Sequence, residues 1–212
     1  MKIRTKESFS DFLDSDLAWR KKELTNLRNN IRTAKAKSLP TSLRAGTVLL
    51  YAHWEGFIKN AAETYLIYVK FHKLRINELD KCFLALAVKQ KINEFDSTSK
   101  STKHIQFIDY ILSPLDERAK INVENVIKTN SNLNFSTLKE LLTTIGIDCT
   151  PFELKENLID EKLLNYRNTI AHGQRLLVEK DEYDILHSEI LNMIIEIKNQ
   201  IQNAVTLDKF KK

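Results

Sequence analysis

The chain has 212 residues, of which 42% are hydrophobic, and carries a formal net charge of +5. This length suits one domain with a sizeable core, and the composition excludes a mainly disordered chain. Only four glycines and three prolines occur. Long helices with few turns are therefore favoured over a many-stranded sheet, and we predict an all-α protein.

Several classes of protein are excluded by what the sequence lacks. Cys82 and Cys149 lie far apart without metal-ligand spacing, so we expect a reducing compartment, no disulfide framework and no metal site. No HExxH, P-loop or GxGxxG motif occurs, which argues against a zinc protease, an NTPase or a dinucleotide enzyme. Neither an apolar leader nor a membrane-spanning run is found, so a soluble, cytoplasmic protein without a cofactor is expected.

The two ends of the chain each predict long helices. Apolar residues spaced near 3.6 indicate a first helix from a cap at Ser10 or Asp11 to about residue 37. Pro40 or Thr41 then starts a second helix to about residue 73, whose apolar face is broad enough for a central position. Near the other end, helices are predicted at 160–172 and at 181–205.

The middle of the chain breaks into shorter pieces. Helical runs are predicted at 77–91, 103–112, 117–129 and 136–145, with Gly146 ending the last of them. We interpret 76–147 as a helical insertion between the second and third core helices. The expected architecture is an up-and-down helical bundle, a single domain over 1–212 with its core at 8–73 and 148–205.

Positive charge is concentrated on the first predicted helix. Residues 20–37 hold seven basic residues and one acid, so this window carries +6 and the rest of the chain −1. A charge concentrated in this way is typical of a surface that binds a polyanion, although a solvated helix face is the ordinary alternative. The candidates for RNA binding are Lys21, Lys22, Arg28 and Arg32.

The stretch YRNTIAHG, residues 166–173, places polar side chains at the end of an apolar helix. The spacing predicts one buried stripe, consisting of Ile159, Leu163, Tyr166 and Ile170. Arg167, Asn168 and His172 lie off that stripe. Gly173 is expected to adopt a left-handed conformation that ends the helix directly after the histidine.

These three polar residue types suit the cleavage of RNA without a metal. That reaction needs proton transfer and stabilisation of charge on the phosphorane. His172 can exchange a proton near neutral pH, Arg167 can bind phosphate oxygens through two N–H groups, and Asn168 can orient either one. Spacing alone is a weak signal, because a histidine and a glycine that merely cap a helix would give the same pattern.

A second polar pair lies on the second predicted helix. Glu55 and Lys59 are four residues apart, so they can form an ordinary intrahelical ion pair or support the site. The remaining histidines have no partner at catalytic or metal-binding spacing and are predicted to be structural or exposed.

Two segments resemble the HEPN superfamily. LLNYRNTIAHG is similar to its Arg-x4-6-His motif, and LLYAHWEGFIKNAAETY is similar to the equivalent helix of the MAE-type branch. The resemblance implies a helical bundle that forms a homodimer, in which two motif helices face each other and make one composite, metal-independent endoribonuclease site. Arg167 and His172 correspond to the catalytic pair, and Asn168 to the polar residue that often follows the arginine.

The resemblance also implies a biological setting, a toxin or a defence effector, with RNA and an antitoxin or neighbouring defence protein as partners. One departure concerns regulation. HEPN toxins paired with nucleotidyltransferase antitoxins carry a tyrosine two residues after the histidine, and here that residue is Gln174. Two alternatives stay open, a catalytically silent RNA-binding module and a purely structural dimerisation module.

Overall fold

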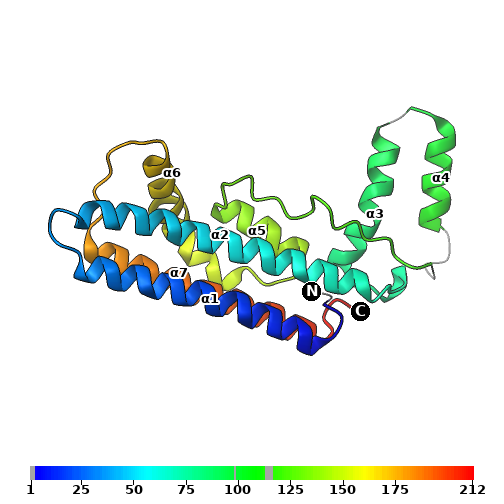
Figure 1. Ribbon diagram of the computed structural model, residues 1–212. Helices are drawn as coiled ribbons and strands as arrows, with labels where there is room; N and C mark the ends of the chain where they lie inside the picture. Colours follow the sequence, from blue (N-terminus) through cyan, green and yellow to red (C-terminus); the bar gives the residue numbers. More distant parts are fainter. Residues whose placement is uncertain (1–2, 98, 113–116) are drawn as a thin grey trace.

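The computed structural model describes residues 3–97, 99–112 and 117–212, and these residues form helices but no β-strand (Figure 1). The prediction of an all-α fold is confirmed. The α-helices are α1 (Lys6–Thr33), α2 (Leu39–Phe71), α3 (Lys81–Asp96), α4 (Ser101–Leu112), α5 (Phe135–Thr144), α6 (Asn165–Ala171) and α7 (Lys180–Thr206). Shorter segments are the 3-10 turns η1 (Ile76–Glu78) and η2 (Thr150–Lys155) and the π-helical segment η3 (Leu158–Leu164).

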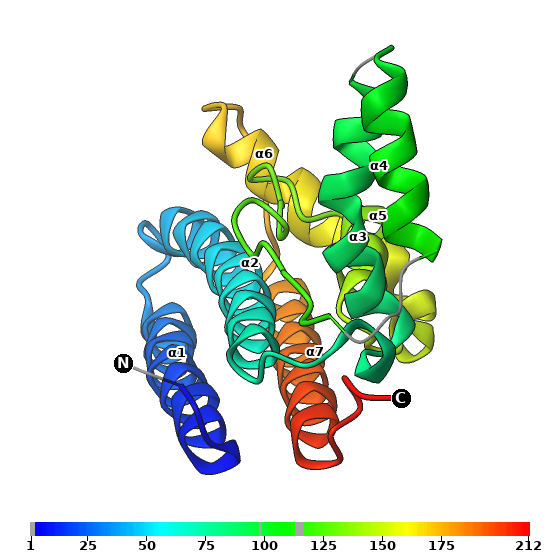
Figure 2. The same ribbon diagram turned by 90° about the vertical axis from the view of Figure 1, so that its right-hand side faces the viewer.

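Three long helices, α1, α2 and α7, lie lengthwise against one another and form the body of the molecule (Figures 1 and 2). Each buries apolar side chains that recur every three or four residues, as α7 does with Ile190, Ile194, Ile197 and Ile201. Helix α2 buries side chains around most of its circumference. It is therefore the central helix, as its broad apolar pattern predicted.

The first helix begins earlier and ends earlier than predicted. Thr5 and Ser8 form a capping box, in which each side chain bonds the other residue's backbone N–H. This arrangement pairs amides that a helix start leaves free, so α1 begins at Lys6 and the predicted cap at Ser10 or Asp11 is wrong. The second helix begins with Pro40 in its first turn, where a missing N–H costs nothing.

The middle segment departs furthest from the predicted pattern. Residues 117–129 are not helical, because their start is paired with the chain after α2: Ala119 donates to the Leu74 carbonyl, and Ile76 donates to that of Glu117. Helices α3 and α4 form a hairpin that rises from the body (Figure 2). The predicted end of α5 at Gly146 is confirmed by that residue's positive φ.

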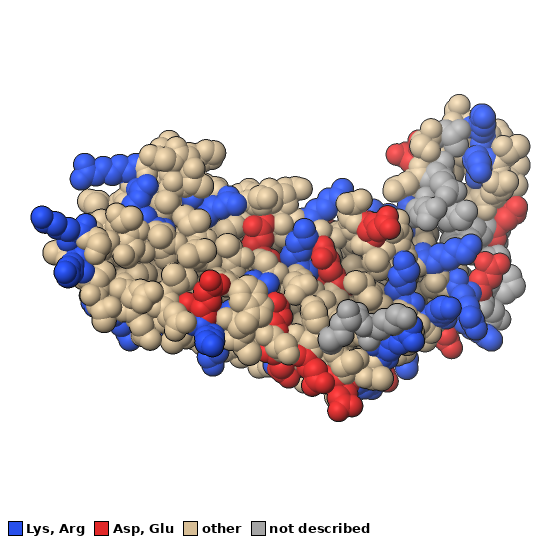
Figure 3. Space-filling view, in the orientation of Figure 1, with Lys and Arg blue, Asp and Glu red and all other residues tan. Residues whose placement is uncertain are grey.

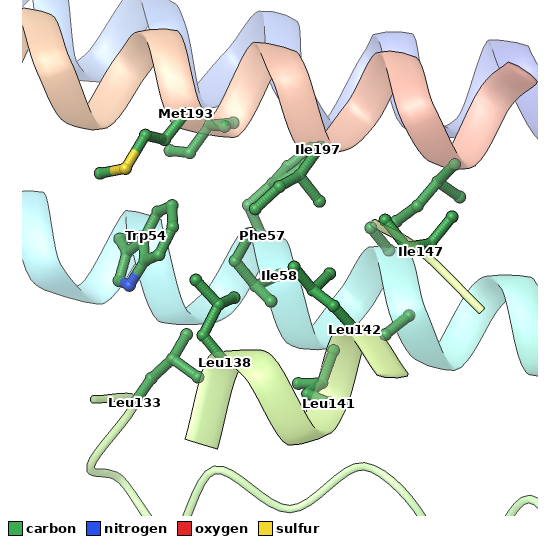
Figure 4. Packing of buried hydrophobic residues seen from close by; sticks show 14 of the residues in the cluster. Trp54, Phe57, Ile58, Leu133, Leu138, Leu141, Leu142, Ile147, Met193 and Ile197 are labelled. Atoms are coloured by element: carbon green, nitrogen blue, oxygen red, sulfur yellow. The ribbon is translucent and has the colours of Figure 1, made fainter. Parts of the chain in front are cut away.

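Helix α5 belongs to the core of the bundle. Its Leu138 and Leu142 are fully buried and lie against α2 residues Phe57 and Ile58, beside Ile197 of α7 (Figure 4). We propose that the core consists of residues 8–73 and 148–205 and that residues 76–147 are an insertion between them. Helix α5 belongs to this insertion in sequence, but it packs inside the core.

The helix that carries the motif contains a π-helical segment, η3, which runs directly into α6. Hydrogen bonds from residue i to i+5 change the phase of the helix. Ile159 and Leu163 are buried as predicted, and Leu164 is buried too, whereas Tyr166 and Ile170 are only half-buried. The predicted stripe is therefore fully buried before the phase change, and after it Tyr166 and Ile170 pack against the core with part of their surface exposed.

None of the helices in the described ranges combines the length and the apolar character that a membrane crossing requires.

Candidate functional site

His172 lies at the end of α6, where the helix closes on a glycine. Gly173 donates to the Ile170 carbonyl and Gln174 donates to the Thr169 carbonyl, both at 3.0 Å. Gly173 has a φ of +75°, as predicted, and a Cβ added there would meet nothing within 4 Å, so the backbone conformation alone favours glycine. His172 itself is exposed. Its imidazole is therefore open to solvent at the end of a helix.

Arg167 is held in place by an aromatic ring and an amide. Its Cζ lies 4.6 Å from the centre of the Tyr51 ring, and its Nη1 donates to Oδ1 of Asn168 at 2.6 Å. The side chain is half-buried, which strengthens the attraction between the cation and the ring. Among the described residues Asn168 is its one hydrogen-bond partner, so four of its five N–H groups can serve a ligand.

A loop that precedes α5 completes this arrangement. The hydroxyl of Tyr51 accepts the Leu133 backbone N–H at 2.7 Å, and Nδ2 of Asn168 is 3.5 Å from Oδ1 of Asn132. The site therefore joins three parts of the chain, α2, this loop and α6. Tyr51 stands within one of the segments quoted for the family resemblance, but nothing in the sequence marks Asn132.

Tyr51 has a structural role in this cluster. Burial raises the pKa of Tyr51 to about 12; the Leu133 N–H opposes this shift, the carboxylate of Glu55 adds to it, and the Arg167 charge opposes it. The phenol is therefore neutral at physiological pH and is no base. It can hold the guanidinium and the loop without taking part in proton transfer.

Glu55 lies one helical turn after Tyr51 on α2. It is half-buried, and one of its carboxylate oxygens is buried without a hydrogen-bond partner in the described part of the chain. The predicted intrahelical pair with Lys59 is not formed, since Lys59 is exposed and lies 4.0 Å from Glu63 instead. The structure thus brings Glu55 towards the Tyr51 and Arg167 cluster and leaves Lys59 outside it.

The predicted basic surface of α1 is partly occupied by ion pairs. Arg28 and Arg32 both bind Asp184 of α7, at 2.5 Å and 3.3 Å. These arginines fasten α1 to α7, and only Lys21 and Lys22 of the four candidates extend into solvent without such a bond. RNA binding by α1 stays a prediction. Of its four candidate residues, Lys21 and Lys22 are exposed without an ion pair, whereas Arg28 and Arg32 are paired with Asp184.

The loop after the motif is fastened to the start of α2. Nη1 of Arg44 donates to the Gln174 carbonyl at 2.8 Å and lies 3.5 Å from that of Leu176. This contact limits how far the chain that follows His172 can move. Arg44 was not among the residues that the sequence singled out.

Neither cysteine is suited to act as a nucleophile. Both are unpaired, and burial raises the pKa of Cys82 to about 12 and also raises that of Cys149. The thiols are therefore protonated near neutral pH. In the described ranges no three His, Cys, Asp or Glu side chains are grouped so that they could hold a metal ion.

Comparison with known proteins gives one match. The family model described as RiboL-PSP-HEPN matches residues 15–203. No curated protein and no solved structure matches the chain. The predicted membership of the HEPN superfamily is confirmed, whereas the match does not support the narrower assignment to the MAE-type branch.

Proposed function

The chain belongs to the RiboL-PSP-HEPN family, and from this membership and the geometry of its motif helix we propose that it is a metal-independent endoribonuclease. One observation carries the proposal. The guanidinium of Arg167 is fixed by Tyr51 and Asn168, while His172, five residues later, is exposed at the end of the same helix. A fixed cation and an exposed imidazole at the end of one helix suit phosphoryl transfer better than helix capping alone.

Each residue has a part in the proposed reaction. The 2′-hydroxyl of a ribose attacks the adjacent phosphate, the bond to the 5′-oxygen breaks, and a 2′,3′-cyclic phosphate results. His172 takes part in proton transfer, Arg167 stabilises the charge that develops on the phosphorane, and Asn168 orients the guanidinium. Glu55 has a supporting role through Tyr51. Lys59 is not given one, because it lies outside the cluster.

The proposed site is completed by a second copy of the chain. Among the described residues no hydrogen bond joins His172 to Arg167, and one imidazole cannot be base and acid in the same step. In a two-fold homodimer two motif helices face each other, so two histidines can divide these roles. Tyr166 and Ile170 on α6 pack against the core and keep part of their surface exposed, and this exposed part can contribute to such an interface.

The first experiment incubates purified wild-type protein and its His172→Ala variant with mixed cellular RNA in excess EDTA. We expect cleavage by the wild type, 2′,3′-cyclic phosphate ends, and a rate for the variant that is lower by about 10²- to 10⁴-fold. Arg167→Lys is the matched variant for the second residue, because it keeps the charge and loses the paired N–H groups. If the wild type binds RNA but cleaves none, the protein is a binding module instead.

Mixed dimers test the composite site. A dimer of one wild-type chain and one His172→Ala chain should lose most activity if both histidines act on one phosphate. Full activity in that mixed dimer would contradict a shared site. Whether the enzyme is a toxin or a defence effector, held in check by an antitoxin or a neighbouring protein, is part of the same proposal and is tested by expressing the active and His172→Ala forms in cells.

A further inference from the structure

A second basic surface lies where α2 ends. There a hollow of about 420 Å³ is lined by Lys70, Lys73, Arg118 and Lys120. Figure 3 shows Lys and Arg side chains gathered at this end of the molecule. No local pattern groups these residues, because Lys73 and Arg118 are 45 positions apart in the sequence.

Local backbone structure explains the gathering. The chain after α2 pairs with the chain at 117–121 through an antiparallel bridge between Arg75 and Arg118. In extended segments alternate side chains point to opposite sides. Ile121 is buried, so Arg118 and Lys120, which alternate with it, are turned outward and are exposed. On the facing part of the chain, Lys70 lies in the last turn of α2, and Lys73 follows that helix in a left-handed conformation with a φ of +49°; both are exposed. Four cations therefore line one hollow.

These cations differ from several others in the body of the molecule. Arg28, Lys155 and Lys162 each bind a carboxylate. Within the described ranges no carboxylate forms an ion pair with any of the four cations that line the hollow. Like charges close together repel each other, so a surface of this kind is stabilised by an anionic ligand.

We propose that this hollow binds the phosphate backbone of an RNA strand while another part of the same strand lies at Arg167. The choice of RNA as the ligand rests on the proposed function. Lys70 is on the same helix as Tyr51, the residue that holds Arg167, and lies about 28 Å further along its axis. A stacked strand covers that distance with about eight nucleotides. Between α6 and the α3–α4 hairpin the molecular surface forms a shallow saddle (Figure 3), which leaves room for a strand to pass.

Continuity with the candidate site favours RNA over an acidic protein segment. Phosphates recur along a strand at short, regular intervals, and four cations around one hollow can contact more than one of them. The surface would select substrates by length, since a short fragment that occupies the Arg167 site does not reach it.

The test measures RNA binding in the His172→Ala background, so that the RNA stays intact. The variant is Arg118→Ala with Lys120→Ala, and the matched control is Arg118→Lys with Lys120→Arg, which keeps both charges. The probes are fluorescein-labelled single-stranded RNAs of about 20 and about 6 nucleotides; the longer one exceeds the roughly eight nucleotides that separate Lys70 from the Arg167 site, and the shorter one does not. Fluorescence anisotropy gives the Kd of each at several salt concentrations.

For the long RNA we expect the alanine variant to bind roughly 10- to 30-fold more weakly near 0.1 M salt and to lose about 1.4 from the slope of log K against log salt, since each phosphate contact contributes about 0.7. The control should match the parent, and the short RNA should show no difference. Unchanged affinity and slope for the long RNA would overturn the inference. So would polyglutamate that competes as well as RNA, because the hollow would then serve an acidic protein.

The two proposals fail in different ways. Absence of cleavage by the wild-type chain overturns the endoribonuclease, but leaves a length-dependent loss of binding in the alanine variant intact. Normal cleavage together with unchanged binding overturns the basic hollow alone. A third comparison uses the alanine variant with an active His172: it should cleave the short RNA at the parental rate and the long RNA more slowly at limiting concentration.

Discussion

Replacing Tyr51 separates two functions that this side chain combines. Its ring lies under the guanidinium of Arg167, and its hydroxyl accepts the N–H of Leu133. Tyr51→Leu removes both contacts, whereas Tyr51→Phe removes only the hydrogen bond. We therefore expect Tyr51→Leu to slow RNA cleavage, and Tyr51→Phe to lower stability while it leaves most of the rate.

The size of each effect follows from the geometry. A cation at 4.6 Å from a partly desolvated ring gains about 0.5–2 kcal/mol. If this attraction holds Arg167 in its reactive position, its loss slows the chemical step by about 2- to 30-fold, since 1.36 kcal/mol corresponds to a factor of ten. In Tyr51→Phe the buried Leu133 N–H loses its acceptor, which costs about 1–3 kcal/mol of unfolding free energy.

Single-turnover cleavage and denaturant unfolding measure the two quantities. The decisive comparison is a double-mutant cycle with Arg167→Ala. If Tyr51 acts on the reaction through Arg167, Tyr51→Leu should cause no further loss of rate once the arginine is absent. Equal losses from Tyr51→Leu in the presence and absence of Arg167 would refute the reasoning, as would a larger loss of rate in Tyr51→Phe than in Tyr51→Leu.

Three further changes test single features of the structure. Gly173→Ala forces an alanine into a left-handed conformation at a cost of about 1–2 kcal/mol. Amide hydrogen exchange at the end of α6 should therefore become faster in this variant, whereas in Gly173→Asn it should stay near the wild-type rate. Equal exchange rates in the two variants would contradict the left-handed conformation as the reason for glycine at this position. Asp184→Asn breaks the ion pairs to Arg28 and Arg32 and should cost about 1 kcal/mol near pH 7. Burial raises the pKa of Asp184, but the Arg28 hydrogen bond and charge, with those of Arg32, outweigh this and hold it below its usual value, so the difference from wild type should be lost as pH falls through that lowered pKa. Burial, together with the Arg28 charge, lowers the pKa of His187. As pH falls below about 6.5, the unfolded chain therefore binds that proton first, and the free energy of unfolding should fall by at most about 1.4 kcal/mol per pH unit. His187→Leu should flatten this dependence, and an unchanged slope would exclude His187 as its origin.

Helices were predictable from the sequence where their signals are local. The apolar spacing of 181–205 predicted α7 nearly to its ends, because a helix that packs along its whole length needs one continuous stripe. The end of α6 at Gly173 was predictable for a similar reason. Only the conformation of one residue and its nearest amides decide that turn.

Predictions failed where distant parts of the chain compete with local preference. Residues 117–129 carry a helical pattern, yet their start bonds to the chain after α2. The π-helical segment η3 shifts the phase of the motif helix, so Tyr166 and Ile170 are only partly buried where they pack against the core. Neither event has a short-range signal.

The sequence by itself determined the all-α class, the positions of the long helices and the three polar residues of the motif, since periodicity and side-chain chemistry act over a few residues. Tertiary structure alone decided which side chains surround Arg167 and which cations stay unpaired. Tyr51 reaches Arg167, and Asp184 reaches Arg28, across more than a hundred positions. Such contacts depend on how far each helix is rotated about its own axis, and that rotation is set by the packing of the whole core.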